Sequence, residues 1–169
     1  MSRQDFWHNN LMDYFKDPEN NSYNHIRHSL KTRLEKFGFC YLGEGRHRCV
    51  FLAPCATKVY KFPIGRSGIS ANHREANNWR RKLKDEADLV RFEFARCKLL
   101  GDTDILIQEY LYDVRFHHWK QQLRDDPELP RWALQWECAQ IGQNKHGEWV
   151  LYDYADYDEY WDEDDDFSV

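Results

Sequence analysis

The sequence predicts an α+β fold in which a five-stranded antiparallel sheet packs against one helix, with further helices before it. Three observations predict this class. Residues 39–62 and 91–112 hold short apolar runs separated by glycine, proline or polar residues, which is typical of strands. Residues 71–87 place a set of side chains at helical spacings of three and four. Aromatic residues make up 16% of the chain, enough to build a core despite its polar composition.

Two helices are expected before the sheet. Residues 4–16 carry aromatic and leucine side chains at near-helical spacing, and Pro18 ends the segment because the residue before proline avoids the α region. Ser22 can cap a second helix over 23–37, whose apolar residues recur on one face. Gly38 is expected to end this helix.

The middle of the chain predicts the order strand, strand, strand, helix, strand, strand. The apolar runs 39–43 and 49–53 form a hairpin, and 57–62 forms the third strand. The segment 63–68 is expected to be a loop, with Ser70 opening the helix over 71–87. The last two strands are expected in 91–100 and 105–112, joined by the turn 101–104.

The C-terminal third gives weaker signals. Residues 114–124 and 131–141 are each expected to be helical, and His146–Gly147 is expected to be a turn before a strand over 149–152. The last fourteen residues, 156–169, contain eight acidic residues and no basic ones. The net charge of the chain is -5, so the body without this tail carries a small positive charge.

Composition excludes several classes of protein. The five cysteines are odd in number and lack C-x-x-C spacing, which argues against a disulfide framework and a structural zinc site. No signal peptide or long apolar run is visible, so we expect a cytoplasmic protein without a membrane partner. The basic cluster 80–84 is followed at once by acids, so direct nucleic-acid binding is not expected.

The stretch "LGEGRHRCVF", residues 42–51, holds two glycines at the tip of the predicted hairpin. Gly43 and Gly45 lack a Cβ atom, so backbone N–H groups there can approach phosphate oxygens closely. An ordinary hairpin turn explains the same two glycines. Lys61 lies near the end of the third predicted strand, and Glu75 lies on the following helix. The two glycines alone do not distinguish a phosphate-binding loop from an ordinary turn, so the order of the surrounding residues has to be considered.

That order resembles the N-terminal lobe of protein kinases, and is similar to small bacterial YrbL-type and bacteriophage kinase-like proteins. The resemblance covers about residues 39–112 and 140–155. It implies that Gly43, Gly45 and Val50 belong to a nucleotide-binding loop. It also implies that Lys61 contacts phosphate and is held by an ion pair with Glu75.

The same resemblance extends to a hinge and a metal ligand. "LIQEYL" is similar to the strand that enters the kinase hinge, with Glu109, Tyr110 and Leu111 at the adenine edge. "GEWVLYDYA" resembles the strand before the metal-binding aspartate, which would be Asp153. ATP and Mg²⁺ are the cofactors that the family uses, and a carboxylate is a suitable Mg²⁺ ligand.

The sequence departs from the family at its catalytic parts. Arg48 replaces the third loop glycine, while Gln135 and Gln140 fall where a catalytic aspartate and a metal-binding asparagine would stand. In another alignment, "HGE" at 146–148 is the catalytic loop and Glu148 is the base. About 30 residues separate Leu111 from Gln140, too few for a full C-terminal lobe.

The resemblance, together with these departures, divides the chain into four expected regions. They are an N-terminal helical segment over 1–37, a kinase-like N-lobe over 38–112, a reduced C-lobe over 113–155 and an acidic tail over 156–169, which we expect to be disordered.

Three functions fit the sequence. The first is a minimal pseudokinase-like binding protein, bacterial or from a phage, that acts on a protein partner. The second is a small Mg²⁺–ATP-dependent phosphotransferase that uses Lys61, Glu75 and Asp153. The third is an acidic mimic of nucleic acid whose tail binds a basic partner. The tail could instead fold back on the basic loop 46–48 or on the segment 77–84. The tail residues expected to bind are Asp162, Glu163, Asp164, Asp165 and Asp166.

Overall fold

The computed structural model describes residues 23–84, 93–117, 127–130, 132 and 139–155. Its first element is helix α2, Tyr23–Lys36, which confirms the helix expected over 23–37. Gly38 follows it with φ 82°, a left-handed conformation that glycine adopts without strain, and the Gly38 N–H donates to the Glu35 carbonyl. The helix expected over 4–16 lies outside the described residues.

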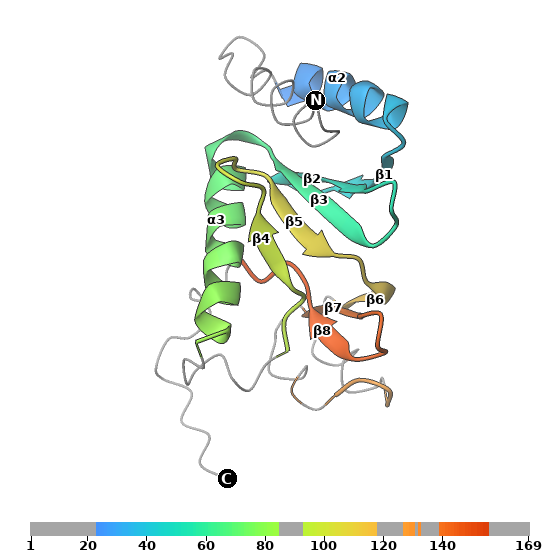
Figure 1. The fold of residues 1–169 in the computed structure, drawn as a ribbon, viewed down its shortest axis with the longest axis vertical. Helices are drawn as coiled ribbons and strands as arrows, with labels where there is room; N and C mark the ends of the chain where they lie inside the picture. Colours follow the sequence, from blue (N-terminus) through green and yellow to red (C-terminus); the bar gives the residue numbers. More distant parts are fainter. Residues whose placement is uncertain (1–22, 85–92, 118–126, 131, 133–138, 156–169) are drawn as a thin grey trace.

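A five-stranded antiparallel sheet forms the centre of the molecule, as expected (Figure 1). Its strands lie in the order β1-β2-β3-β5-β4. The strands are β1, Cys40–Glu44; β2, Arg48–Leu52; β3, Lys58–Pro63; β4, Cys97–Leu99; and β5, Leu106–Glu109. β2 and β3 pair in a register that places Val50 opposite Lys61, and β3 pairs with β5 so that Lys61 lies opposite Leu106.

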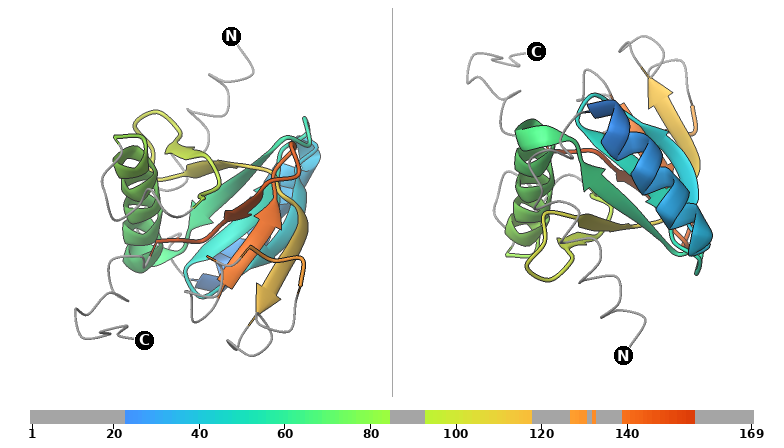
Figure 2. Two further views of the ribbon diagram at one scale, coloured as in Figure 1. Left: turned by 90° about the horizontal axis from the view of Figure 1, so that it is seen from below. Right: turned by 90° about the horizontal axis from the view of Figure 1, so that it is seen from above.

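Helix α3, Gly65–Lys82, follows β3 almost at once and lies along one side of the sheet (Figures 1 and 2). The expected loop over 63–68 is therefore wrong for most of its length. Two glycines explain the early start. Gly65 has φ 64°, which allows the sharp turn out of β3. At Gly68 a Cβ atom would come within 2.2 Å of the His47 carbonyl oxygen, so only glycine lets the helix approach the β2–β3 backbone this closely.

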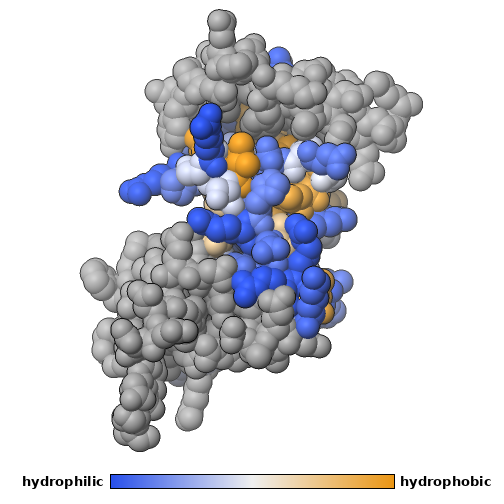
Figure 3. Space-filling model, turned by 90° about the vertical axis from the view of Figure 1, so that its left-hand side faces the viewer, coloured by the Kyte–Doolittle hydropathy of each residue, from blue (hydrophilic) through white to orange (hydrophobic). Residues whose placement is uncertain are grey.

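Helix α3 is polar on its outer side and buried on its inner side. Its exposed positions recur every three or four residues, and Figure 3 shows hydrophilic side chains gathered on this side of the molecule. The inner side carries small apolar residues, Ala71 and Ala76, but also buried polar ones, Asn72, Glu75 and Asn78. Buried polar side chains require hydrogen-bond partners, so the inner side of α3 is where a functional site is to be sought.

A second, three-stranded antiparallel sheet follows, in the order β6-β7-β8. Its strands are β6, Tyr112–His117; β7, Ala139–Gln143; and β8, Trp149–Leu151. The helix expected over 114–124 is wrong at 114–117, and that expected over 131–141 is wrong at 139–141, because these two segments pair as strands. The turn at His146–Gly147 and the strand after it are confirmed.

Three apolar clusters hold these layers together, the smallest of which consists of Ala95, Leu111 and Val150. Of the two larger clusters, one lies at the α2 end of the large sheet and includes Leu30, Leu34, Phe51 and Phe62. The other joins α3 to both sheets, and its buried members are Ala76, Phe94, Cys97, Leu106, Ile141, Leu151 and Tyr154. The second sheet is thus packed against the first. Within the described residues, neither helix is long and apolar enough to cross a membrane.

Candidate functional site

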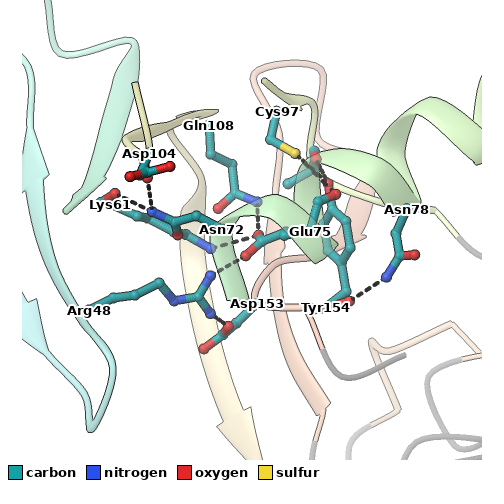
Figure 4. A network of polar contacts seen from close by, with 11 residues as sticks. Arg48, Lys61, Asn72, Glu75, Asn78, Cys97, Asp104, Gln108, Asp153 and Tyr154 are labelled. Carbon is teal, nitrogen blue, oxygen red and sulfur yellow. Dashed lines mark hydrogen bonds and ion pairs between the residues drawn. The ribbon is translucent and has the colours of Figure 1, made fainter. Parts of the chain in front are cut away.

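Lys61 and Glu75 form an ion pair in the space between β3 and α3. The Lys61 Nζ lies 2.7 Å from the Glu75 Oε1, and the two residues are only 4% and 0% exposed. The contact between them that the sequence predicted is therefore present. β3 directs Lys61 toward the helix, and the inner side of α3 directs Glu75 toward the sheet (Figure 4).

The Glu75 carboxylate accepts hydrogen bonds from two further side chains that the sequence did not indicate. Gln108 on β5 donates from Nε2 to the Glu75 Oε1 at 2.9 Å. Arg48 at the start of β2 donates from Nη1 to the Glu75 Oε2. One buried carboxylate is thus surrounded by two cations and an amide, and hydrogen bonds to a charged group are the stronger kind.

The charges of this cluster change the pKa values of its members. Burial lowers the pKa of Lys61 to about 8, although the neighbouring Glu75 carboxylate acts in the opposite direction. Burial by itself would raise the pKa of Glu75, but the positive charges of Lys61 and Arg48 and their hydrogen bonds outweigh it, so that pKa is lowered. Glu75 is therefore ionised at neutral pH and holds the cluster together.

Arg48 also bridges Glu75 to Asp153. Its Nη2 forms an ion pair with the Asp153 Oδ1, so one guanidinium contacts both carboxylates (Figure 4). The Asp153 side chain is 35% exposed, while that of Arg48 is 9% exposed. Asp153 follows β8 with φ 61°, a left-handed conformation that is uncommon outside glycine. The aspartate predicted to bind metal is thus paired with arginine, and the four charges sum to zero.

The two predicted loop glycines lie at the hairpin that carries Arg48. Gly43 has φ 156° and lies at a β-bulge in the β1–β2 pairing. The Gly45 N–H donates to the Arg48 carbonyl at 2.9 Å and closes the turn. A Cβ atom at either glycine would meet no atom within 4 Å. Space beside both glycines is therefore free of protein atoms, whereas the side chain of Arg48 is buried.

The predicted hinge residues run from the last residue of β5, Glu109, to the residue before β6, Leu111, and so link the two sheets. The Glu109 N–H donates to the Arg96 carbonyl at 2.9 Å, and the Glu109 carboxylate accepts from the Arg96 N–H at 2.7 Å. The Tyr110 N–H donates to the Thr57 carbonyl at 3.0 Å. Leu111 is buried. Two backbone N–H groups of this segment are thus engaged within the protein.

Tyr154 anchors the chain after Asp153. Its hydroxyl donates to the Ala95 carbonyl at 2.7 Å and lies 3.1 Å from the Cys97 Sγ, while its carbonyl accepts from the Asn78 Nδ2 at 3.1 Å. Burial raises the pKa of Cys97 to about 12 and that of Tyr154 well above its usual value. Both groups are neutral at physiological pH and have a structural role beside the charged cluster.

Asn72, on the same inner side of α3, holds the backbone of β3 at Lys61 against the helix. Its Nδ2 donates to the Lys61 carbonyl at 2.9 Å and to the Asp104 carbonyl at 2.8 Å. The sequence did not single out Asn72. The sequence feature that could have indicated it is the three-residue spacing of Asn72, Glu75 and Asn78, which places all three on the inner side of one helix.

Two residues that the sequence placed in a catalytic loop in one or the other alignment, Gln140 and Glu148, lie in the second sheet and its turn. Gln140 lies on β7, where its carbonyl accepts from the Tyr152 N–H, and Gln135 lies outside the described residues. Glu148 precedes β8 and accepts a hydrogen bond from Asn144 in the turn, whereas Asp153 follows β8. In the alternative alignment, the expected base and metal ligand therefore lie before and after β8, respectively.

Among the described residues, no three histidine, cysteine or acidic side chains gather as a metal site. The five acidic tail residues, from Asp162 to Asp166, lie outside the described part of the chain. No protein-family model, curated protein or solved structure matches this sequence or its fold. Function has to be argued from the cluster itself.

Proposed function

We propose that this chain is a kinase-like binding protein without catalytic activity, which acts by contact with another protein. The observation that carries the proposal is the position of Arg48. Its guanidinium contacts Glu75 and Asp153, the two carboxylates that a kinase-like enzyme would use to orient its lysine and to bind its metal ion. Arginine at this place makes the cluster neutral without a nucleotide or a metal.

The kinase-like part of the proposal is supported by the order of elements and by one contact. Three strands, a helix and two strands occur in the order that the resemblance requires. The strand lysine and the helix glutamate, Lys61 and Glu75, form the expected ion pair at 2.7 Å. Both observations favour a retained scaffold.

Two observations favour the absence of catalysis. A metal ion on Asp153 would compete with Arg48, and a buried arginine that loses a carboxylate partner carries a large desolvation penalty. Gln140 stands where a metal-binding asparagine is expected, and its neutral amide is a weaker Mg²⁺ ligand than a carboxylate.

A protein partner is favoured by the exposed apolar residues on β6. Tyr112 and Val114 are both exposed there, and the Tyr112 ring packs edge-on against Tyr110 with ring centroids 5.0 Å apart. Exposed aromatic and apolar side chains that lie together are typical of contact surfaces. We therefore assign the binding role to this surface of the second sheet.

The alternative is a small phosphotransferase that uses Lys61, Glu75 and Asp153 with Mg²⁺–ATP. The preserved Lys61–Glu75 pair favours it. In that case Arg48 has to leave Asp153 when nucleotide binds.

Thermal unfolding with nucleotide separates the two functions. We expect millimolar ATP with Mg²⁺ to leave the melting temperature of the wild-type protein unchanged, and phosphate transfer to be absent. In Arg48→Gly, which restores the third loop glycine and frees Asp153, we expect ATP with Mg²⁺ to raise the melting temperature. A wild-type shift that Lys61→Ala and Asp153→Ala abolish, together with phosphate transfer, would establish the enzyme instead.

The binding role needs its own test. Tyr112→Ser with Val114→Ser should abolish capture of a partner, whereas Leu42→Ser, at an exposed position of the other sheet, should leave it intact. Equal capture of the partner by the wild-type protein, the Tyr112→Ser/Val114→Ser variant and the Leu42→Ser variant would exclude the β6 surface as the binding site.

A further inference from the structure

Arg80, Leu83 and Lys84 are exposed at the C-terminal end of α3 and are called the basic surface below, although Lys82 is ion-paired with Glu93 and acids follow Lys84 in the sequence. The last turn contains Arg80, Arg81 and Lys82, and Lys84 follows. Arg80 and Lys84 are exposed, and between them Leu83 is 64% exposed. An exposed leucine flanked by two exposed bases offers both charge and apolar contact to a segment that carries acids and aromatic residues.

The described part of the chain ends on the buried side of α3, two turns or less from this surface along the helix. Tyr154 and Ala155 are buried, and the Tyr154 carbonyl accepts a hydrogen bond from Asn78 of α3 at 3.1 Å. Lys84 lies six residues beyond Asn78, a rise of about 9 Å along a helix. The tail over 156–169 begins beside α3, and fourteen extended residues can span about 45 Å. The basic surface is well within its reach.

The composition of the tail complements that surface. Its fourteen residues include eight acids and no base, and its aromatic residues are Tyr157, Tyr160, Trp161 and Phe167. Opposite charges attract over about 8 Å at physiological salt, and anchoring at Ala155 keeps the tail at a high local concentration.

We propose that residues 156–169 bind the C-terminal end of α3 in the same molecule. The acids contact Arg80 and Lys84, and an aromatic residue of the tail covers Leu83. The inference rests on the charges and on the anchoring of Tyr154, and it does not depend on the proposed function.

Nuclear magnetic resonance on the full chain tests the contact from the side of the helix. The variant replaces five tail acids by amides: Asp162→Asn, Glu163→Gln, Asp164→Asn, Asp165→Asn and Asp166→Asn. At 50 mM salt we expect the backbone amide signals of 80–84 to differ between wild type and variant, and at 500 mM salt to coincide. Unchanged signals of 80–84 at low salt would overturn the proposal.

The reciprocal variant tests the contact from the side of the tail. Arg80→Glu combined with Lys84→Glu should shift the tail amide signals. A matched control, Arg33→Glu with Lys36→Glu, reverses two exposed bases in the last turn of α2, at the opposite end of the molecule (Figure 1). Equal tail shifts in the control would contradict a specific contact. The shifts should persist on tenfold dilution, whereas their loss would show a contact between molecules and overturn the proposal.

Discussion

The middle and the C-terminal end of α3 use charge in opposite ways. Near its middle, Glu75 is fully buried and is matched by Lys61, Arg48 and Gln108 from three strands. At its C-terminal end, Arg80 and Lys84 are exposed to water. One helix thus fixes the fold with matched, buried charge in its middle and exposes charge to solvent at its end. Buried charges are costly when they lose a partner, whereas exposed ones are not.

Removing the buried carboxylate in the middle of α3 should have the largest effect. Glu75→Gln leaves the buried Lys61 with a neutral amide in place of its carboxylate and Arg48 with Asp153 alone, and we expect the free energy of unfolding to fall by about 3–5 kcal/mol. Urea denaturation measures it. The matched control is Glu35→Gln at an exposed position of α2, where a change within about 0.5 kcal/mol is expected. Equal effects at both positions would contradict the role of burial.

The buried lysine should make stability depend on pH. The pKa of Lys61 is about 8 in the folded protein, below its ordinary value of 10.5. Between those two pH values the unfolded chain binds a proton that the folded protein does not, so stability from this group rises with pH across the window. The free energy of unfolding of the wild-type protein, relative to that of Lys61→Met, should increase by on the order of 3 kcal/mol from pH 8 to 10.5. A constant or falling difference in unfolding free energy would show that Lys61 keeps an ordinary pKa.

A Cβ atom at the N-terminal end of α3 should disturb its contact with the sheet. Gly68→Ala places that atom within 2.2 Å of the His47 carbonyl oxygen, and we expect a loss of about 1–3 kcal/mol as the helix shifts. Gly45→Ala, where a Cβ atom meets nothing within 4 Å, is the control for thermal denaturation. If Gly68→Ala and Gly45→Ala are equally stable, the close approach of α3 to the His47 carbonyl is refuted.

Charge reversal at the exposed end should have the smallest effect on stability. Arg80→Glu with Lys84→Glu should change the free energy of unfolding by less than about 1 kcal/mol, and salt should reduce that change. Denaturation at 50 and 500 mM salt measures both. A large loss that persists at high salt would mean that these side chains are part of the core packing.

The sequence by itself determined the parts of the fold whose signals are local. Helix α2 ends two residues before Gly38, the three strands up to Pro63 are bounded by turn residues, and the turn at His146–Gly147 precedes a strand. The Lys61–Glu75 contact was expected only from the resemblance to protein kinases, not from local patterns.

Tertiary structure decided what depends on distant partners. Residues 114–117 form a strand because β7, more than twenty residues later, supplies their hydrogen bonds, and an apolar run alone does not tell a strand from a helix. Arg48 looked like a substituted loop glycine, yet the folded chain brings it against Glu75 and Asp153, 27 and 105 positions away. A buried charge takes whichever opposite charge the fold brings within reach, and sequence spacing alone does not specify that partner.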